Sequence, residues 1–254
     1  MTDNPTYNPD EFLICAVARL LADSRHVAIG MASPVAGSAA LMLREEAKGS
    51  PDALRVSMIG GDANNPFTDG GRELFDCAGQ GRIDTFFLGG VQIDGQANIN
   101  LVGTGDYPNM DRRFPGTFGA AYMYFVIPRV ILFRPEHSKR VFVPKVDFIS
   151  APGTSEEGVY RPGGPYALVT ELCVMMFDKE KKRFRLASVN PGHTIEEVQD
   201  NTGFDFDIPE AIKTTPEPEP EPERLELLRT NISLEIAKTY PDFAKRVFGV
   251  EQAA

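Results

Sequence analysis

The sequence predicts an α/β fold with an open, mainly parallel sheet and a strand-rich second half. Helix-like and strand-like segments alternate in the first half, whereas short apolar runs of strand type dominate the second half. Three of the predicted strands end in glycine, at Gly30, Gly60-Gly61 and Gly89-Gly90. Because ligands of open α/β sheets collect at the carboxyl ends of strands, we expect a binding site at these glycines.

The first half opens with a helix signal. Asn8 is a capping residue, Pro9 suits the first helical position, and apolar residues recur at helical spacing from Leu13 to Leu21. A small-residue loop at 32–38 leads into a second helix that we expect to end at Glu46. The remaining elements expected in this half are strands at 26–31, 54–59 and 83–88 and a helix at 72–78.

The second half contains mostly strand signals. We expect strands at 122–127, 130–133, 141–143, 167–177 and 184–189. The charged segment from Asp178 to Lys182 predicts a hairpin loop between the last two strands. Thr194 and Glu197 form a capping-box pattern, which predicts a helix that ends before Gly203.

A Pro/Glu tract divides the C-terminal residues from the rest. We expect an α/β domain at 1–214, an extended and self-repelling linker at 215–223, and a helical arm at 224–254. The arm carries four apolar residues at helical spacing: Leu225, Leu228, Ile232 and Ile236. They predict an amphipathic helix that packs on the body or on a partner subunit.

Composition and charge argue against two classes of partner. The net charge of −10 and a pI near 4.9 leave no basic excess for binding nucleic acid. The most apolar stretch, 120–133, is interrupted by Pro128-Arg129 and is too short to span a bilayer. Since the N-terminus also lacks a signal-peptide pattern, we expect a cytoplasmic protein without a membrane partner.

Cysteines, histidines and common catalytic motifs give no site. The three cysteines are widely spaced and form no CxxC pair, which predicts reduced core thiols: Cys15, Cys77 and Cys173. The three histidines lack metal-ligand spacing, so no metal is expected: His26, His137 and His193. The sequence contains no nucleophile elbow, Walker A, GxGxxG or HExxH pattern.

The most informative segment is GGVQIDGQANIN at 89–100, followed by RFPGTFG at 113–119. Further motifs are KVDFISAPG at 145–153, GGP at 163–165, VT at 169–170 and NPGHT at 190–194. In this order and approximate spacing they resemble the beta subunits of family I CoA-transferases, the glutaconate type especially. The resemblance extends from the first helix to residues 201–205, and it implies the CoA-transferase type of α/β fold.

The resemblance also implies a set of residues that bind the acyl group or CoA: Met58, Gly60, Gly61, Gln92, Asn98, Asn100, Arg113, Gly116, Thr117, Phe118 and Gly119. Asn98 and Asn100 share one face of an extended segment, where they could bind a polar ligand or tie down a loop. Arg113, next to Arg112, could contact a phosphate or carboxylate or form part of a surface pair. Asp147 and Ser150 favour a turn over a site.

The turn at 116–119 resembles the family's G-S-G-G turn, whose backbone amides can hold a thioester oxyanion. Phe118 replaces a glycine there and adds an aromatic wall suited to an apolar acyl group. The family also implies a glutamate that becomes acylated, and Met58 or Ile59, depending on the register, stands in its place. Asp62 is the nearest acid. A transferase needs this carboxylate nucleophile.

A subunit of this family without the glutamate resembles the beta subunit of bacterial hydrolases that open the last steroid ring of a cyclic β-keto CoA thioester. That resemblance implies no certain catalytic residue in this chain and a glutamate base on a homologous alpha subunit, in a heterotetramer of two alpha and two beta chains. CoA enters only as part of the substrate, with no other cofactor. The alternatives are a true CoA-transferase and a non-catalytic subunit that shapes its partner's site.

Overall fold

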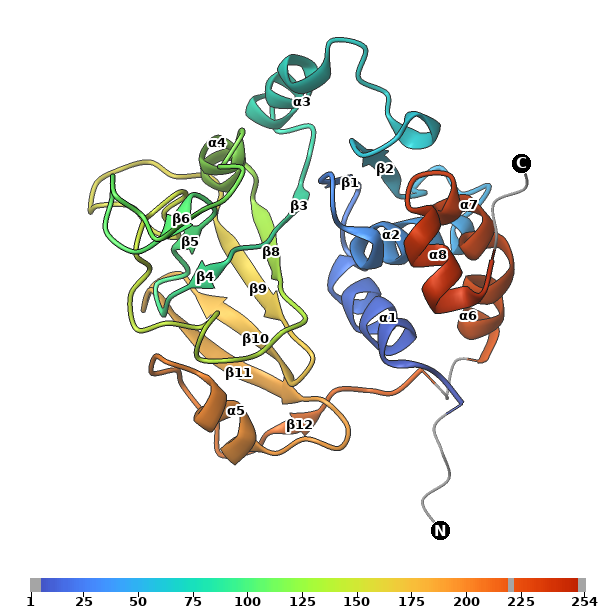
Figure 1. Cartoon of the computed structure of the whole chain (residues 1–254). Helices are drawn as coiled ribbons and strands as arrows, with labels where there is room; N and C mark the ends of the chain where they lie inside the picture. The colour runs from blue at the N-terminus through green and yellow to red at the C-terminus, as the bar shows by residue number, and fades with distance from the viewer. Residues whose placement is uncertain (1–5, 219–221, 251–254) are drawn as a thin grey trace. The chain divides into compact units, whose positions relative to one another are not determined.

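The computed structural model describes residues 6–218 and 222–250, and these form two compact units. Unit 1 comprises residues 1–70 and 216–254, and unit 2 comprises residues 71–215. The N-terminal segment and the C-terminal arm, drawn in blue and red in Figure 1, therefore belong to one unit.

Unit 1 contains two helices and two parallel strands at its N-terminal side. They are α1 (Pro9–Leu21), β1 (His26–Ile29), α2 (Pro34–Glu46) and β2 (Arg55–Met58), followed by the short 3-10 helix η1 (Asp62–Asn64). The predicted start of α1 is confirmed, because the Asn8 side chain accepts from the Glu11 amide at 2.9 Å and Glu11 accepts from the Asn8 amide at 2.8 Å. The expected strands and helices of this region are confirmed to within a few residues.

The C-terminal arm folds against α2 of the same unit. It consists of α6 (Pro222–Leu227), a π-helical turn η2 (Leu228–Ile232), α7 (Ser233–Ala237) and α8 (Pro241–Phe248). The four apolar residues expected on its inner face are all buried. The sequence left open whether the arm packs on the body or on a partner subunit, and in the structure it packs on its own chain. Residues 219–221 of the expected linker lie outside the described residues, whereas Arg19 donates to the carbonyls of Pro216 and Glu217.

Unit 2 contains a mixed six-stranded array in the order β12-β11-β10-β9-β8-β3. Its strands are β3 (Thr85–Leu88), β8 (Arg129–Phe133), β9 (Pro165–Val169), β10 (Cys173–Asp178), β11 (Arg183–Val189) and β12 (Lys213–Thr214). The β3–β8, β8–β9 and β11–β12 pairs are parallel, and the β9–β10 and β10–β11 pairs are antiparallel. Together with the parallel β1–β2 pair of unit 1, four of these six pairings are parallel, which agrees with the predicted mainly parallel sheet.

Helices and two hairpins complete unit 2. The helices are α3 (Gly70–Gly79), α4 (Ala120–Val126) and the short α5 (Ile195–Asn201), whose Thr194 cap accepts from the Glu197 amide as predicted. One hairpin pairs β4 (Gln92–Ile93) with β5 (Ile99–Asn100), and the other pairs β6 (Gly103–Thr104) with β7 (Arg112–Arg113). In Figure 1 the first hairpin is the pair labelled β4 and β5.

Three strand predictions were wrong or incomplete. The apolar run 122–127 forms α4, because a continuous apolar run has the same pattern in a buried helix as in a buried strand. Residues 141–143 form no strand and make a single bridge between Phe142 and Ile93. The expected strand 167–177 is two strands, divided at a tight corner where the Thr170 amide donates to the Cys173 carbonyl.

Candidate functional site

The β4–β5 hairpin follows Gly89-Gly90 and is held by side-chain amides. Gln92 donates to Asp147 Oδ2 at 3.1 Å, and its own oxygen accepts from Asn100 Nδ2 at 2.8 Å and from the Asp147 amide at 3.0 Å. Asn100 Nδ2 also donates to the Gly103 carbonyl, while its oxygen accepts from the Val102 and Gly103 amides. Both amide side chains are buried. They therefore fix the start of the loop that leads to the second hairpin.

Asn98 has a similar internal role at the hairpin turn. Its side chain donates to Asp94 Oδ2 at 3.1 Å and accepts from the Gly153 amide at 3.0 Å. Ser150 accepts from the Leu101 amide at 2.7 Å, so the 145–153 motif is a turn that supports the hairpin, as expected. For Asn98 and Asn100 the geometry favours the loop-tying alternative, since these bonds use the amide groups.

The turn at 116–119 carries a strained and exposed aromatic residue. Phe118 adopts a left-handed backbone conformation, with φ of +46°, and its side chain is 82% exposed. Its ring centroid lies 5.5 Å from that of Phe75 on α3, and Phe75 lies 5.7 Å from Tyr122 on α4. A left-handed conformation at a residue other than glycine costs about 1–2 kcal/mol. Strain of this kind occurs preferentially at functional sites, and this favours a ligand contact for Phe118.

The same turn presents unused backbone donors. The Gly116 and Ala120 amides donate to the carbonyls of Leu101 and Thr117. Among the described residues, no protein acceptor meets the amides of Thr117, Phe118 and Gly119. Backbone N–H groups without a protein acceptor can hold an oxyanion where they converge, and this is the role that the family resemblance implies for the turn.

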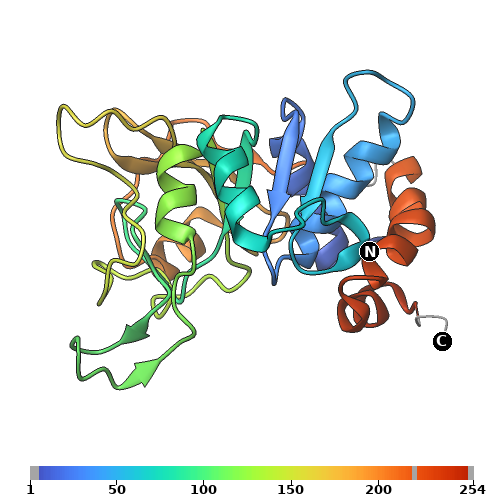
Figure 2. The same cartoon turned by 90° about the horizontal axis from the view of Figure 1, so that it is seen from above.

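The β6–β7 hairpin adds two guanidinium groups, and Figure 2 shows it extending away from the rest of unit 2. Arg112 lies 5.4 Å from the centroid of Phe114, and Arg113 contacts the Met110 sulfur at 3.8 Å. Both arginines are exposed, and neither has a carboxylate partner in the described part of the chain. The two cations are thus available for a phosphate or carboxylate of a ligand.

In unit 1, Met58 closes β2 and is fully buried. A Cβ at Gly37 would lie 3.1 Å from both the Met58 methyl group and Ile236 Cδ1, so the Met58 side chain fills the core between α2 and the arm. This corrects the expectation that Met58 lines an acyl pocket. Ile59 is half-exposed, and of the two it therefore occupies the reachable position. Neither side chain is a nucleophile, and Asp62 in η1 is an exposed carboxylate beyond them.

The glycines after β2 are covered by two arm residues that sequence reasoning missed. The Tyr240 hydroxyl donates to the Gly30 carbonyl at 3.0 Å and lies 3.0 Å from the place of a Gly60 Cβ. Both side-chain tips of Thr239 lie 2.9 Å from the place of a Gly61 Cβ. Burial raises the pKa of Tyr240. No motif marks these residues, because they are separated from β2 by about 180 residues.

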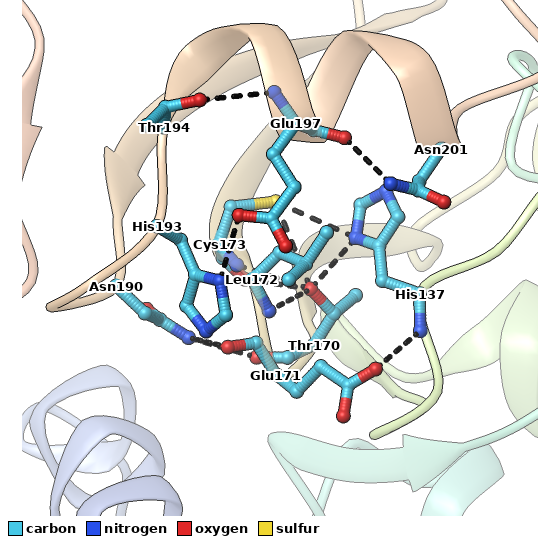
Figure 3. Close-up of polar contacts among 10 residues, drawn as sticks. All are labelled: His137, Thr170, Glu171, Leu172, Cys173, Asn190, His193, Thr194, Glu197 and Asn201. Atoms are coloured by element: carbon cyan, nitrogen blue, oxygen red, sulfur yellow. Dashed lines mark hydrogen bonds and ion pairs between the residues drawn. The ribbon is translucent and has the colours of Figure 1, made fainter.

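A buried polar cluster joins the β9–β10 corner to α5 (Figure 3). His137 contacts the Thr170 hydroxyl at 2.8 Å, the Thr202 hydroxyl at 2.9 Å and Cys173 Sγ at 3.8 Å. No sequence pattern indicates that a cysteine has a histidine neighbour. Burial lowers the pKa of His137 to about 4 and raises the pKa of Cys173 to about 12, so both groups are neutral. The cluster supports the fold and supplies no thiolate.

Neither a metal centre nor a membrane span is evident in the part of the chain that the structure describes. Over residues 6–218 and 222–250, no group of three or more His, Cys, Asp or Glu side chains has a metal-binding arrangement. Within the same ranges, none of the helices combines the length and apolarity needed to cross a bilayer.

Comparison with known proteins shows the family. A family model described as Coenzyme A transferase matches residues 11–201. The chain belongs to the coenzyme A transferase family. The resemblance inferred from the glycine-rich motifs is therefore confirmed.

Individual relatives of this coenzyme A transferase family member include two kinds of enzyme. A subunit of the 3-oxoadipate CoA-transferase of Pseudomonas knackmussii is 33% identical over 235 residues, which cover 82% of this chain and 88% of the relative. The cholesterol ring-cleaving hydrolase IpdB subunit of Rhodococcus jostii is 32% identical over 138 residues, which cover 53% and 54%. A subunit of the glutaconate CoA-transferase of Acidaminococcus fermentans is 36% identical over half of each chain.

Solved structures agree on the fold. The Rhodococcus jostii IpdAB structure has a TM-score of 0.76 at 26% identity, covering 89% of this chain and 94% of the matched chain. A variant of the decarboxylase AibA/AibB has a TM-score of 0.71 at 26% identity, covering 87% and 94%. Both are named as two-part assemblies, and the curated relatives are named as subunits.

Proposed function

We propose that this chain is the beta subunit of a two-subunit cytoplasmic hydrolase. The enzyme opens a cyclic β-keto CoA thioester of the kind formed from the last ring in steroid breakdown. It does so by adding water and breaking a carbon–carbon bond. The observation that carries the proposal is the end of β2. The position of the family's acylated glutamate holds buried Met58 or half-exposed Ile59, and neither can attack a thioester.

The chemistry of the ring opening fits a site without its own nucleophile. Water attacks the ring ketone, the bond to the carbon next to the thioester breaks, and the departing carbanion is stabilised as the thioester enolate. The enzyme must supply a base for the water and hydrogen-bond donors for the enolate oxygen. We assign the base to a glutamate of a homologous alpha subunit and the donors to the free amides of Thr117, Phe118 and Gly119.

The other contacts assigned to this chain concern binding. Arg113 and Arg112 are exposed cations suited to the phosphates of the CoA portion of the substrate, and no further cofactor is proposed. The exposed ring of Phe118 offers an apolar wall for the acyl ring. We assign the active assembly as two alpha and two beta chains, since the named relatives are subunits of paired enzymes.

Two relatives support carbon–carbon cleavage over group transfer. IpdB belongs to a ring-cleaving hydrolase, and AibA/AibB is a decarboxylase, whose reaction also breaks a carbon–carbon bond. The second candidate is a true CoA-transferase, which the 33% identity to the 3-oxoadipate enzyme over most of both chains favours. That reaction requires a carboxylate nucleophile, and Asp62 is the acid nearest to the end of β2 in sequence.

The experiment combines isotope transfer with adduct trapping. In one reaction the chain and its alpha partner are incubated with a cyclic β-keto CoA thioester in oxygen-labelled water. In a second reaction, borohydride or hydroxylamine is added only after enzyme and substrate have been mixed, because both reagents also attack the substrate. We expect label in the ring-opened acid and an unchanged mass for this chain. A trapped adduct on Asp62, or on any other residue of this chain, would overturn the hydrolase assignment and support transfer. Full turnover by the alpha partner alone would show that this chain is a non-catalytic subunit.

A further inference from the structure

A cavity of about 390 Å³ lies in unit 2, beside the hairpin tip between β10 and β11. It borders Pro165 at the amino end of β9, and Lys179 at its edge donates to the carbonyl of Pro128, which directly precedes β8. Because β3, β8 and β9 are parallel, this is the end of the sheet opposite to Gly89-Gly90. The cavity is therefore distinct from the predicted thioester site.

Three cations line this cavity: Arg161, Lys179 and Lys182. Arg161 is fixed by hydrogen bonds to the carbonyls of Tyr124, Pro152 and Gly163. Lys179 donates to the Pro128 carbonyl at 3.3 Å, and Lys182 donates to the Ser155 carbonyl at 3.1 Å. Each ammonium thus keeps donor capacity for a further acceptor.

The hairpin tip between β10 and β11 aims the two lysines. The Asp178 carboxylate accepts from the Glu180 amide at 3.0 Å and from the Lys181 amide at 2.9 Å. Lys182 takes a left-handed conformation with φ of +55°. In this arrangement Lys179 and Lys182 line the cavity, whereas Lys181 lies outside it and pairs with Asp207 at 3.4 Å.

The cavity lining carries three cationic and two carboxylate side chains, which leaves a formal charge of +1. Glu156 and Glu157 also border the cavity, but in the described part of the chain neither forms an ion pair with the three cations. Burial, and then the charge of Arg161, lowers the pKa of Lys179, and no carboxylate opposes this shift. The whole chain carries a net charge of −10, so a general basic excess does not explain the cluster.

We propose that this cavity binds the phosphate groups of a small phosphorylated molecule. The ammonium groups of Lys179 and Lys182 contact the phosphate oxygens, and Arg161 supplies fixed charge behind them. The apolar part of the lining, Val159, Pro165 and Phe177, accommodates the non-phosphate portion of the ligand. The inference goes beyond the hydrolase proposal and does not depend on it.

The test is titration calorimetry of the whole chain with inorganic pyrophosphate, ADP and CoA. We expect all three to bind, and we expect the K179Q/K182Q double variant to bind pyrophosphate and ADP at least about tenfold more weakly, because charge-assisted hydrogen bonds are lost; CoA binding should persist in part, since Arg112 and Arg113 offer its phosphates a second place. K181Q is the matched control, since it removes one charge from the same tip outside the cavity. Failure of all three probes to bind, or equal binding of pyrophosphate and ADP by the double variant, would overturn the proposal.

A second measurement needs no variant. Pyrophosphate should protect Lys179 and Lys182 of the unaltered chain from chemical acetylation, as mapped by mass spectrometry, and leave Lys181 reactive. Equal reactivity of the three lysines with and without pyrophosphate contradicts the proposal. Binding of CoA without binding of pyrophosphate or ADP also contradicts it, because recognition then depends on the pantetheine portion.

Discussion

Replacement of Phe118 separates its catalytic contribution from its structural one. Glycine at this position removes a left-handed strain of about 1–2 kcal/mol, while the loss of the ring contact with Phe75 costs about 0.5–1.5 kcal/mol. Glycine also adds backbone freedom to the unfolded chain, worth about 0.5–1 kcal/mol. Little apolar area is lost, since the side chain is mostly exposed. These contributions nearly cancel, so the free energy of unfolding should change by less than about 1 kcal/mol for Phe118→Gly.

Phe118→Ala is the informative companion, because alanine keeps the strain and loses the ring. It should lower the free energy of unfolding by about 1 kcal/mol, measured by urea denaturation. Both variants should reduce kcat/KM for a bulky cyclic thioester by at least about tenfold if the ring contributes about 1.4 kcal/mol or more to transition-state binding.

The control is Tyr160→Ala, which removes another highly exposed aromatic ring from unit 2 without touching this turn. It should leave turnover unchanged. Unchanged kinetics in both Phe118 variants would refute the reasoning, because the strained ring would then have no contact with the substrate, and the turn would be a purely structural feature.

Three further predictions concern stability. Burial lowers the pKa of His137 to about 4, against about 6.5 in the unfolded chain. The free energy of unfolding should therefore keep its full His137 contribution above pH 6.5 and fall by about 3 kcal/mol as the pH drops to 4. In urea denaturation, the free energy of unfolding should depend less on pH in His137→Gln than in the unaltered chain, whereas His193→Gln should show no such change. Gly61→Ala should lower Tm through its clash with Thr239, and adding Thr239→Ala should restore it; no restoration would assign the loss elsewhere. Arg229→Met should lower the free energy of unfolding, measured by urea denaturation, by about 2 kcal/mol, because the buried carboxylate of Glu11 then lacks its cationic partner. An unchanged denaturation midpoint would contradict this.

Local signals account for the elements that were predicted well from the sequence. The α1 start is specified by Asn8 and Glu11, which cap each other, and the α5 start by Thr194. Short apolar runs bounded by glycine predicted β1, β2 and β3 to within a few residues. In these places the information lies in neighbouring residues, so no tertiary contact is needed to read it.

The errors arise where tertiary contacts decide. Ala120, Met123 and Tyr124 are buried at helical spacing, but the aromatic and apolar residues around them also suit a strand. Phe142 bridges Ile93 without a ladder, because both hydrogen bonds between that segment and the hairpin, through Val141 and Val143, go to Ile93 alone. The contact of Cys173 with His137 joins residues 36 positions apart and leaves no periodic pattern.

In the candidate site, too, the sequence alone does not show which contacts a polar side chain makes. The motif at 89–100 left ligand binding and loop tying open for Asn98 and Asn100, and the structure uses Gln92 and Asn100 to shape the loop. Residue types alone do not distinguish an amide that binds a ligand from one that binds the backbone, because both roles need the same donors and acceptors.

The glycines at the end of β2 have two physical explanations, and the structure favours one of them for Gly61. A Gly-Gly pair after a strand allows a ligand to approach the backbone, which is the reason for the sequence prediction. In unit 1, however, Thr239 and Tyr240 already occupy the space that side chains at these positions would need. Gly61 has an extended backbone that any residue adopts, so only the arm requires a glycine there. The arm therefore provides a sufficient reason for Gly61, and the case for a thioester site in this chain depends mainly on Phe118 and the free amides beside it.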